Sequence, residues 1–102
     1  MPRATLILRE KVIDEAGNTM ETAIWSVPID KRTPAGVRYR LAFIRCGDSQ
    51  PVVLYDNHHP KGHHRHLDGA EESYAFVDVD RLLHDFAEDV GRVTGDTTWP
   101  RR

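Results

Sequence analysis

Five of the chain's six histidines fall within residues 58–66 of a 102-residue sequence. An imidazole exchanges protons near neutral pH, because its ordinary pKa is about 6.5. The same stretch and the residues just before it also provide two fixed cations, a carboxylate and an amide: Lys61, Arg65, Asp56 and Asn57. This density of reactive side chains indicates a site for proton transfer, phosphate binding or metal binding.

The first interpretation is general acid–base catalysis on RNA. Cleavage without a metal ion requires a base for the 2′-hydroxyl, an acid for the leaving 5′-oxygen and a cation for the phosphate. If residues 64–66 are extended, His64 and His66 point to the same side, with their Cβ atoms about 7 Å apart. This spacing suits two imidazoles that flank one phosphate, while Lys61 or Arg65 stabilises the developing charge.

The neighbouring residues have supporting roles in this interpretation. In an extended segment, His63 and Arg65 point to the opposite side, unless the turn at Gly62 rotates one of them back. Asp56 or Asn57 is expected to orient an imidazole, because the tautomer of a histidine depends on what its second nitrogen binds.

Two other interpretations compete with acid–base chemistry. A His-x-His pair on a strand can place two imidazoles on one metal ion, with Asp56 or His58 as a further ligand. The cations Lys61 and Arg65 oppose a divalent ion, and the spacing matches no zinc signature, so neither a metal nor a cofactor is predicted. Alternatively the segment is structural, because Asp56 and Asn57 are ordinary turn formers.

Composition and charge exclude several classes of protein. The net charge of −2 gives no overall attraction to nucleic acid, but residues 30–45 hold five basic side chains and one acidic one. A single cysteine, Cys46, rules out an internal disulfide and a four-cysteine zinc site. Neither a signal-peptide pattern nor an 18-residue apolar run occurs, so a cytoplasmic protein without a membrane segment is expected.

Hydrophobic periodicity predicts strands followed by a helix. Alternating residues and turn residues place strands at residues 6–13, 19–27, 37–45, 52–55, 63–67 and 73–76. Apolar residues three and four positions apart then predict a helix from Val79 to Val93, with Asp78 as its N-cap. The sixth histidine, His84, lies on the polar side of this helix and is assigned no function.

The expected fold class is therefore α+β. We predict a mostly antiparallel, five- to six-stranded sheet with one C-terminal helix packed on a face, in a single domain that spans residues 1–102. Its core covers about residues 5–93, and residues 96–102 form a loose tail. An antiparallel sheet can leave its second face to water, and Arg38 and Arg40 are expected on that face.

The histidine segment also resembles a known family. The motif Tyr55-Asp56-Asn57 followed by Lys61-Gly62-His63-His64-Arg65-His66 resembles the TumE family, small toxins of bacterial and archaeal toxin–antitoxin pairs. Residues 8–11 with 24–28 are similar to the family's first hairpin, and residues 74–76 with 82–86 are similar to its final strand and helix.

This resemblance implies a cytoplasmic toxin whose partner is a small DNA-binding antitoxin encoded beside it. RNA is the expected substrate by analogy, because RNA cleavage is common among toxins of this size. The residues transferred by position are His63, His64 and His66 as catalytic residues and Lys61, Arg65, Asp56 and Asn57 in support.

The leading hypothesis is thus a metal-independent ribonuclease toxin in which His64 and His66 act as acid and base. Lys61 or Arg65 stabilises the phosphate, and Arg38 and Arg40 extend the cationic surface. The alternative is a non-enzymatic module that binds a partner protein or nucleic acid, and a metal-dependent hydrolase is the third hypothesis. Exposed sheet edges make a homodimer a further expectation.

Overall fold

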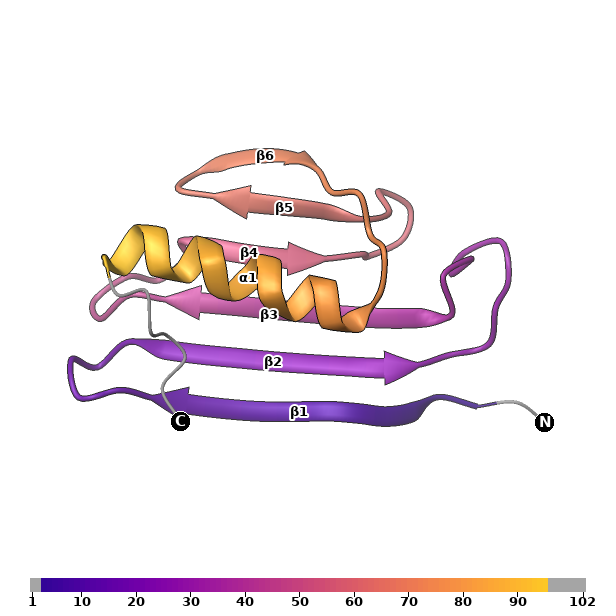
Figure 1. The fold of residues 1–102 in the computed structure, drawn as a ribbon, viewed down its shortest axis with the longest axis horizontal. Coiled ribbons are helices and arrows are strands. Elements are labelled where there is room, and N and C mark those ends of the chain that lie inside the picture. The colour runs from indigo at the N-terminus through magenta and orange to yellow at the C-terminus, as the bar shows by residue number, and fades with distance from the viewer. Residues whose placement is uncertain (1–2, 96–102) are drawn as a thin grey trace.

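A computed structural model describes residues 3–95 of the chain, so the tail predicted at residues 96–102 lies outside the described part. Six strands form one antiparallel sheet in which each strand pairs with its neighbours in sequence (Figure 1). In order, these are β1 (Thr5–Ile13), β2 (Thr19–Ser26), β3 (Val37–Ile44), β4 (Val53–Asp56), β5 (His64–Leu67) and β6 (Ala70–Ser73). The predicted meander of antiparallel strands is confirmed.

One helix, α1 (Val79–Thr94), crosses a single face of this sheet and contacts β4 (Figure 1). Its first turn is capped as predicted, because the Asp78 carboxylate accepts a hydrogen bond of 2.8 Å from the backbone N–H of Arg81. The helix ends at Gly95, whose left-handed conformation (φ 74°) lets its N–H donate to the carbonyl of Gly91. The predicted α+β class is therefore confirmed.

The core lies between α1 and the strands that it covers. Alternate residues of β3 and β4 point toward the helix and are fully buried, among them Leu41, Phe43 and Tyr55. They meet Leu82 and Phe86 from α1, and each such side chain contributes roughly 1.5–3 kcal/mol when it leaves water. We call this side of the sheet the helix face and the opposite side the open face.

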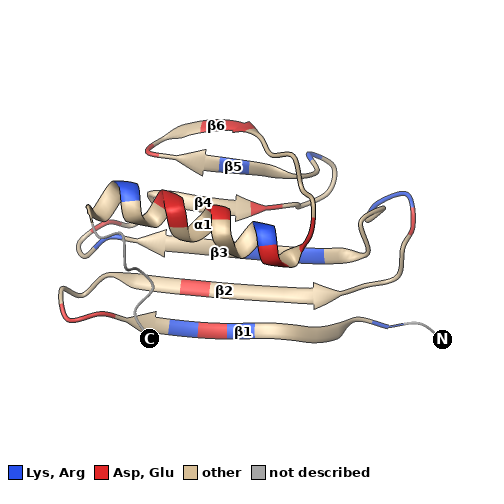
Figure 2. Ribbon diagram, in the orientation of Figure 1, with Lys and Arg blue, Asp and Glu red and all other residues tan. Residues whose placement is uncertain are grey.

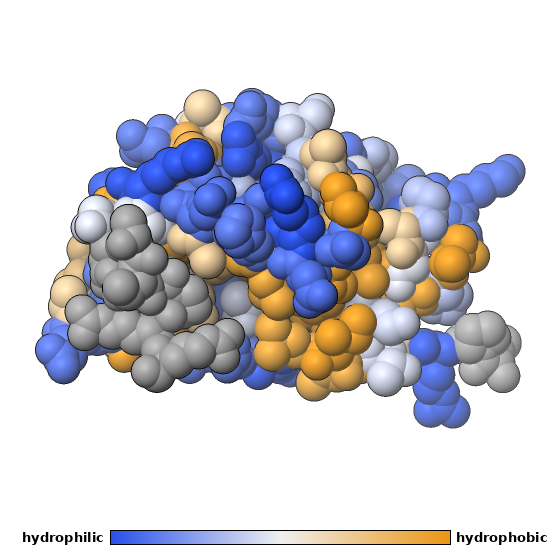
Figure 3. All heavy atoms as spheres, in the orientation of Figure 1, coloured by the Kyte–Doolittle hydropathy of each residue, from blue (hydrophilic) through white to orange (hydrophobic). Residues whose placement is uncertain are grey.

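The helix leaves the first strands partly uncovered. On the helix face, hydrophobic residues are visible over β1 and β2 beside α1, whose own outer surface is hydrophilic (Figure 3). Val12 on β1, for example, is 39% exposed. No helix within residues 3–95 is long and apolar enough to cross a membrane.

The last strand differs from its prediction. It was expected at residues 73–76, but β6 begins at Ala70 and ends at Ser73. Asp68 (φ 50°) and Gly69 (φ 87°) both adopt left-handed conformations and form a two-residue hairpin turn, so pairing starts at once between Leu67 and Ala70. Tyr74 and Phe76, which follow β6, pack, partly buried, against the core instead.

Candidate functional site

Strand register brings the reactive side chains of four strands together on the open face. Arg40 on β3 pairs with Asp56 on β4, which pairs with His64 on β5. In the next row, His66 on β5 pairs with Glu71 on β6. Directly paired residues of antiparallel strands project to the same face, so these five side chains share one surface.

His64 is held on both sides by oxygen atoms. Its Nδ1 lies 2.9 Å from the carbonyl oxygen of Gly62, and its Nε2 lies 2.8 Å from Oδ1 of Asp56. Asp56 Oδ1 is buried, and its contact with His64 lacks the geometry of a well-directed hydrogen bond. The structure thus brings Asp56 against an imidazole.

His66 lies beside His64 and approaches a second carboxylate. The two rings meet edge to face, with their centroids 5.3 Å apart. Nε2 of His66 lies 3.5 Å from Oε1 of Glu71, and Lys61 Nζ lies 3.1 and 3.2 Å from the two Glu71 oxygens. The hydrogen bond from Lys61 lowers the pKa of the Glu71 carboxyl. We call Asp56, Lys61, His64, His66 and Glu71 the open-face cluster.

Glu71 is the member of this cluster that the sequence-based prediction missed. It reaches the histidines only because β6 starts directly after the turn at Asp68 and Gly69, which sets the pairing of His66 with Glu71. An Asp-Gly pair between two short strands is a strong hairpin signal, and it could have placed Glu71 beside His66.

Arg65 lies on the helix face, away from the open-face cluster. Its Nη1 donates hydrogen bonds of 3.1 Å to Tyr55 Oη and to Asp89 Oδ2, and its Nε donates to Glu72. Asp89 comes from α1, is 1% exposed and also accepts a hydrogen bond from the Tyr55 hydroxyl. Burial, and then the bond to Asp89, raise the pKa of Tyr55. The structure therefore does not bring Arg65 to His64 and His66.

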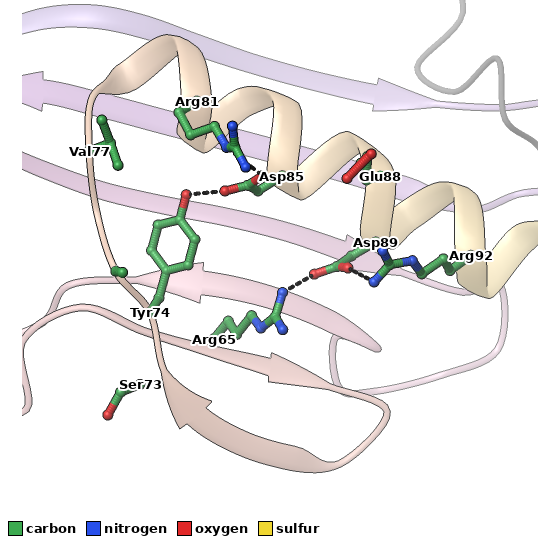
Figure 4. Close-up of a pocket in the computed structure, with 10 residues that line it drawn as sticks. Arg65, Ser73, Tyr74, Val77, Arg81, Asp85, Glu88, Asp89 and Arg92 are labelled. Carbon is green, nitrogen blue, oxygen red and sulfur yellow. Dashed lines mark hydrogen bonds and ion pairs between the residues drawn. The ribbon is translucent and has the colours of Figure 1, made fainter.

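The same network continues along a hollow of about 500 Å³ beside α1 (Figure 4). There the Tyr74 hydroxyl donates to Asp85 at 2.6 Å, and Arg81 Nε donates to the same carboxylate at 3.1 Å. Arg92 pairs with Asp89 at 3.2 Å. These charged groups already neutralise one another, which favours a structural role for the hollow.

His63 is part of an aromatic stack rather than of the open-face cluster. Its ring packs against Tyr39 and Phe76, at centroid distances of 5.6 and 4.9 Å, and those two rings also contact each other at 5.7 Å. Its Nδ1 lies 2.9 Å from Tyr39 Oη. Burial lowers the pKa of His63, which favours the neutral ring. The structure separates this histidine from the other two predicted catalytic residues.

Asn57 completes the pairing of β4 with β3. Its Oδ1 accepts a hydrogen bond of 2.9 Å from the N–H of Tyr39, and its Nδ2 donates one of 2.7 Å to the carbonyl of Val37. Both ends of the amide therefore bind backbone atoms and not an imidazole. His58 and His59, in the loop that follows, are exposed.

The two predicted arginines of β3 are exposed on the open face. Arg38 pairs in register with Trp25, and both line a hollow of about 170 Å³ together with Arg40, Asp56 and other residues. Arg40 also approaches Glu21 at 3.7 Å in a solvent-exposed ion pair. Figure 2 shows basic residues on β1 and β3 and in the loop between β4 and β5. The open face thus combines cations, an aromatic ring and two imidazoles.

Comparison with known proteins gives one match. Residues 3–94 match the model of a family described as Toxin TumE, and this span is nearly the whole chain. No curated protein and no solved structure matches the chain.

Proposed function

The chain belongs to the TumE toxin family and is the toxin of a toxin–antitoxin system, and we propose that it acts by cleaving RNA without a metal ion. One observation carries this proposal. His64 and His66 lie on the same side of β5 with their rings 5.3 Å apart, next to two carboxylates and the ammonium group of Lys61. Two imidazoles and a cation are thereby present on one face of the sheet.

The geometry suggests a role for each group. His66, whose side chain is 31% exposed, takes the proton from the 2′-hydroxyl, and His64, held between two oxygens, gives a proton to the 5′-oxygen. Asp56 positions His64. Lys61 forms only an exposed ion pair with Glu71, which is worth little in water, so it can leave Glu71 and bind the phosphate.

Residues outside the cluster have binding and positioning roles in this proposal. Arg38 and Arg40 bind the RNA backbone, and Trp25 offers a ring on which a base can stack. His63 and Asn57 position the segment through the aromatic stack and the strand pairing. Arg65 acts through the fold, because it binds Asp89 beneath the helix.

The partner and the location follow from the same proposal. The antitoxin is a DNA-binding protein, and the toxin acts in the cytoplasm, where its RNA substrate is found. Two copies pair through β1, because this nine-residue strand is at the edge of the sheet within residues 3–95 and has exposed apolar residues such as Ile7 and Ile13.

The decisive experiment measures RNA cleavage by the purified chain and by His66→Ala, with His84→Ala as the matched control on α1. His66→Ala is expected to lose about 10²–10⁴-fold in rate, the usual contribution of a general acid or base. His84→Ala and the addition of EDTA should leave the rate unchanged. Circular dichroism and urea unfolding verify that both variants fold.

Two outcomes would reject this function. If His66→Ala cleaves RNA at the wild-type rate, the assignment of the base is wrong. If the wild-type chain binds RNA but leaves it intact, the non-enzymatic binding module is correct. One observation favours that second candidate: the His64 side chain is only 9% exposed, so substrate has limited access to it.

A further inference from the structure

We propose that the open-face cluster also binds a divalent transition-metal ion of the Zn²⁺ type through His64, His66 and Glu71. Such an ion would inhibit the toxin, because it would occupy the two imidazoles that transfer protons. The inhibition rests on the proposed ribonuclease function, whereas the binding of the ion does not.

The three side chains already approach the spacing of a metal site. One ligand atom from each lies within 4.8 Å of those of the other two, and His66 Nε2 is 3.5 Å from Glu71 Oε1. Two ligands about 2.0–2.2 Å from a tetrahedral zinc ion are roughly 3.4 Å apart. The pair formed by His66 and Glu71 therefore matches this geometry, and a ligand atom of His64 lies within 4.8 Å of both.

A second, independent observation comes from the surroundings of His64. Its Nδ1 faces the carbonyl oxygen of Gly62, which is the usual outer-shell contact of a metal-bound histidine and leaves Nε2 as the ligand. Beside Nε2, at 2.8 Å, lies Asp56 Oδ1, which is buried and forms no well-directed hydrogen bond within residues 3–95. An ion bound to Nε2 would therefore lie next to a carboxylate oxygen, a group that also ligates Zn²⁺.

Lys61, whose positive charge opposes a metal ion at this site, can move away from Glu71. Lys61 contacts both Glu71 oxygens, but its side chain is 62% exposed and the pair is therefore weak. Binding of the ion would release Lys61 into solvent. Two imidazoles and a carboxylate favour Zn²⁺ or Co²⁺ over Mg²⁺, which prefers oxygen ligands and water.

A second group with suitable ligand types serves as an internal comparison. His84, Asp85 and Glu88 lie close together on α1. Asp85, however, already accepts hydrogen bonds from Tyr74 and Arg81, so this group has less capacity for an ion. We therefore expect the metal ion at the open-face cluster.

The test is titration of the metal-free full chain with Zn²⁺ by calorimetry and with Co²⁺ by visible absorption. We expect one equivalent to bind, and Glu71→Gln to weaken binding by more than about ten-fold, since even loss of an outer-shell partner has that effect. Glu72→Gln removes the same charge from the next residue of β6, whose side chain faces the helix. This control variant should bind Zn²⁺ with wild-type affinity. His84→Ala should also bind normally.

The outcomes are distinguishable from those of the RNA experiment. No binding of Zn²⁺, equal affinity in Glu71→Gln, or loss of binding in His84→Ala alone would overturn the site. If the chain cleaves RNA, Zn²⁺ should inhibit the wild type and Glu72→Gln but not Glu71→Gln, and equal inhibition of all three would overturn the regulation. A chain that binds Zn²⁺ without cleaving RNA would support the site and reject the ribonuclease.

Discussion

Charged side chains on the two faces of β5 lie in different environments. On the helix face, Arg65 is matched by Asp89, which is buried, and by the Tyr55 hydroxyl in a network beneath α1. On the open face, the buried Asp56 Oδ1 contacts His64 Nε2 at 2.8 Å without a well-directed hydrogen bond, and Lys61 and Glu71 pair in solvent. The polar groups around Arg65 are thus paired with one another within the fold, whereas Lys61 and Glu71 are exposed and can still bind a ligand.

This difference shows how a four-residue strand can serve structure and chemistry at once. Alternation sends successive side chains to opposite faces, so neighbours in sequence enter unrelated environments. A satisfied buried network stabilises the fold, whereas an incompletely satisfied one is typical of a binding site. Proximity in the sequence is therefore a poor guide to which charged residues act together in this motif.

Removal of Asp89 should produce the largest effect on the helix face. Asp89→Ala leaves Arg65 partly buried without its main partner, and the free energy of unfolding is expected to fall by about 3 kcal/mol in urea denaturation. Glu88→Ala, an exposed neighbour on α1, should change it by less than about 0.5 kcal/mol. If Asp89→Ala does not fold, Asp89→Asn should fold with reduced stability. Wild-type stability in both variants would mean that the helix-face network is not structural.

A basic residue of the open face should affect RNA binding and not stability. Arg38→Ala is expected to weaken RNA binding and to reduce the slope of log affinity against log salt by about 0.7, the value for one contact with a single strand. Its free energy of unfolding should stay within about 0.5 kcal/mol of wild type. Arg81→Ala, on α1, should leave the slope unchanged. An equal reduction of this slope in Arg38→Ala and Arg81→Ala would show that RNA does not bind the open face in preference to the helix face.

The smallest expected effect concerns His63. Burial lowers the pKa of this histidine from its ordinary value of 6.5. Below that pH the unfolded chain binds the proton more readily than the folded chain, so stability is lost as the pH falls toward the lowered pKa. His63→Phe can stack but cannot titrate, so urea midpoints in EDTA should fall less between neutral and acidic pH than in wild type. An equal decrease of the urea midpoint in wild type and in His63→Phe would show that burial does not lower the pKa of His63.

His63→Phe also decides the role of this residue. If His63 only positions the segment, the variant should keep most of the RNA-cleaving rate. A loss of more than about 100-fold in a folded variant would place His63 in the chemistry instead.

Local patterns were sufficient to predict most of the fold. The alternation in β3 and the spacing of Leu82 and Phe86 gave the correct faces, because a buried layer on one side forces period two in strands and period 3.6 in helices. Alternation also predicted that His64 and His66 share a side, as the structure shows. These properties depend only on residues close in sequence.

The remainder of the site depends on partners distant in sequence. Arg65 was expected at the phosphate, because nothing local shows that Asp89, 24 residues later, comes within hydrogen-bonding distance of it. Asn57 was expected to orient an imidazole, but its amide binds the backbone of a strand that ends 13 positions earlier at Ile44. Such contacts are fixed by register and by helix placement, which composition and spacing do not determine.

The meander order of the sheet has a consequence for synthesis. Every strand pairs with the one made immediately before it, so the sheet can assemble in the order in which the ribosome releases it. The helix that supplies Leu82, Phe86 and Val90 to the core follows all six strands. A nascent chain therefore cannot close its core until the helix has emerged. A folded toxin can therefore appear only after α1 has left the ribosome.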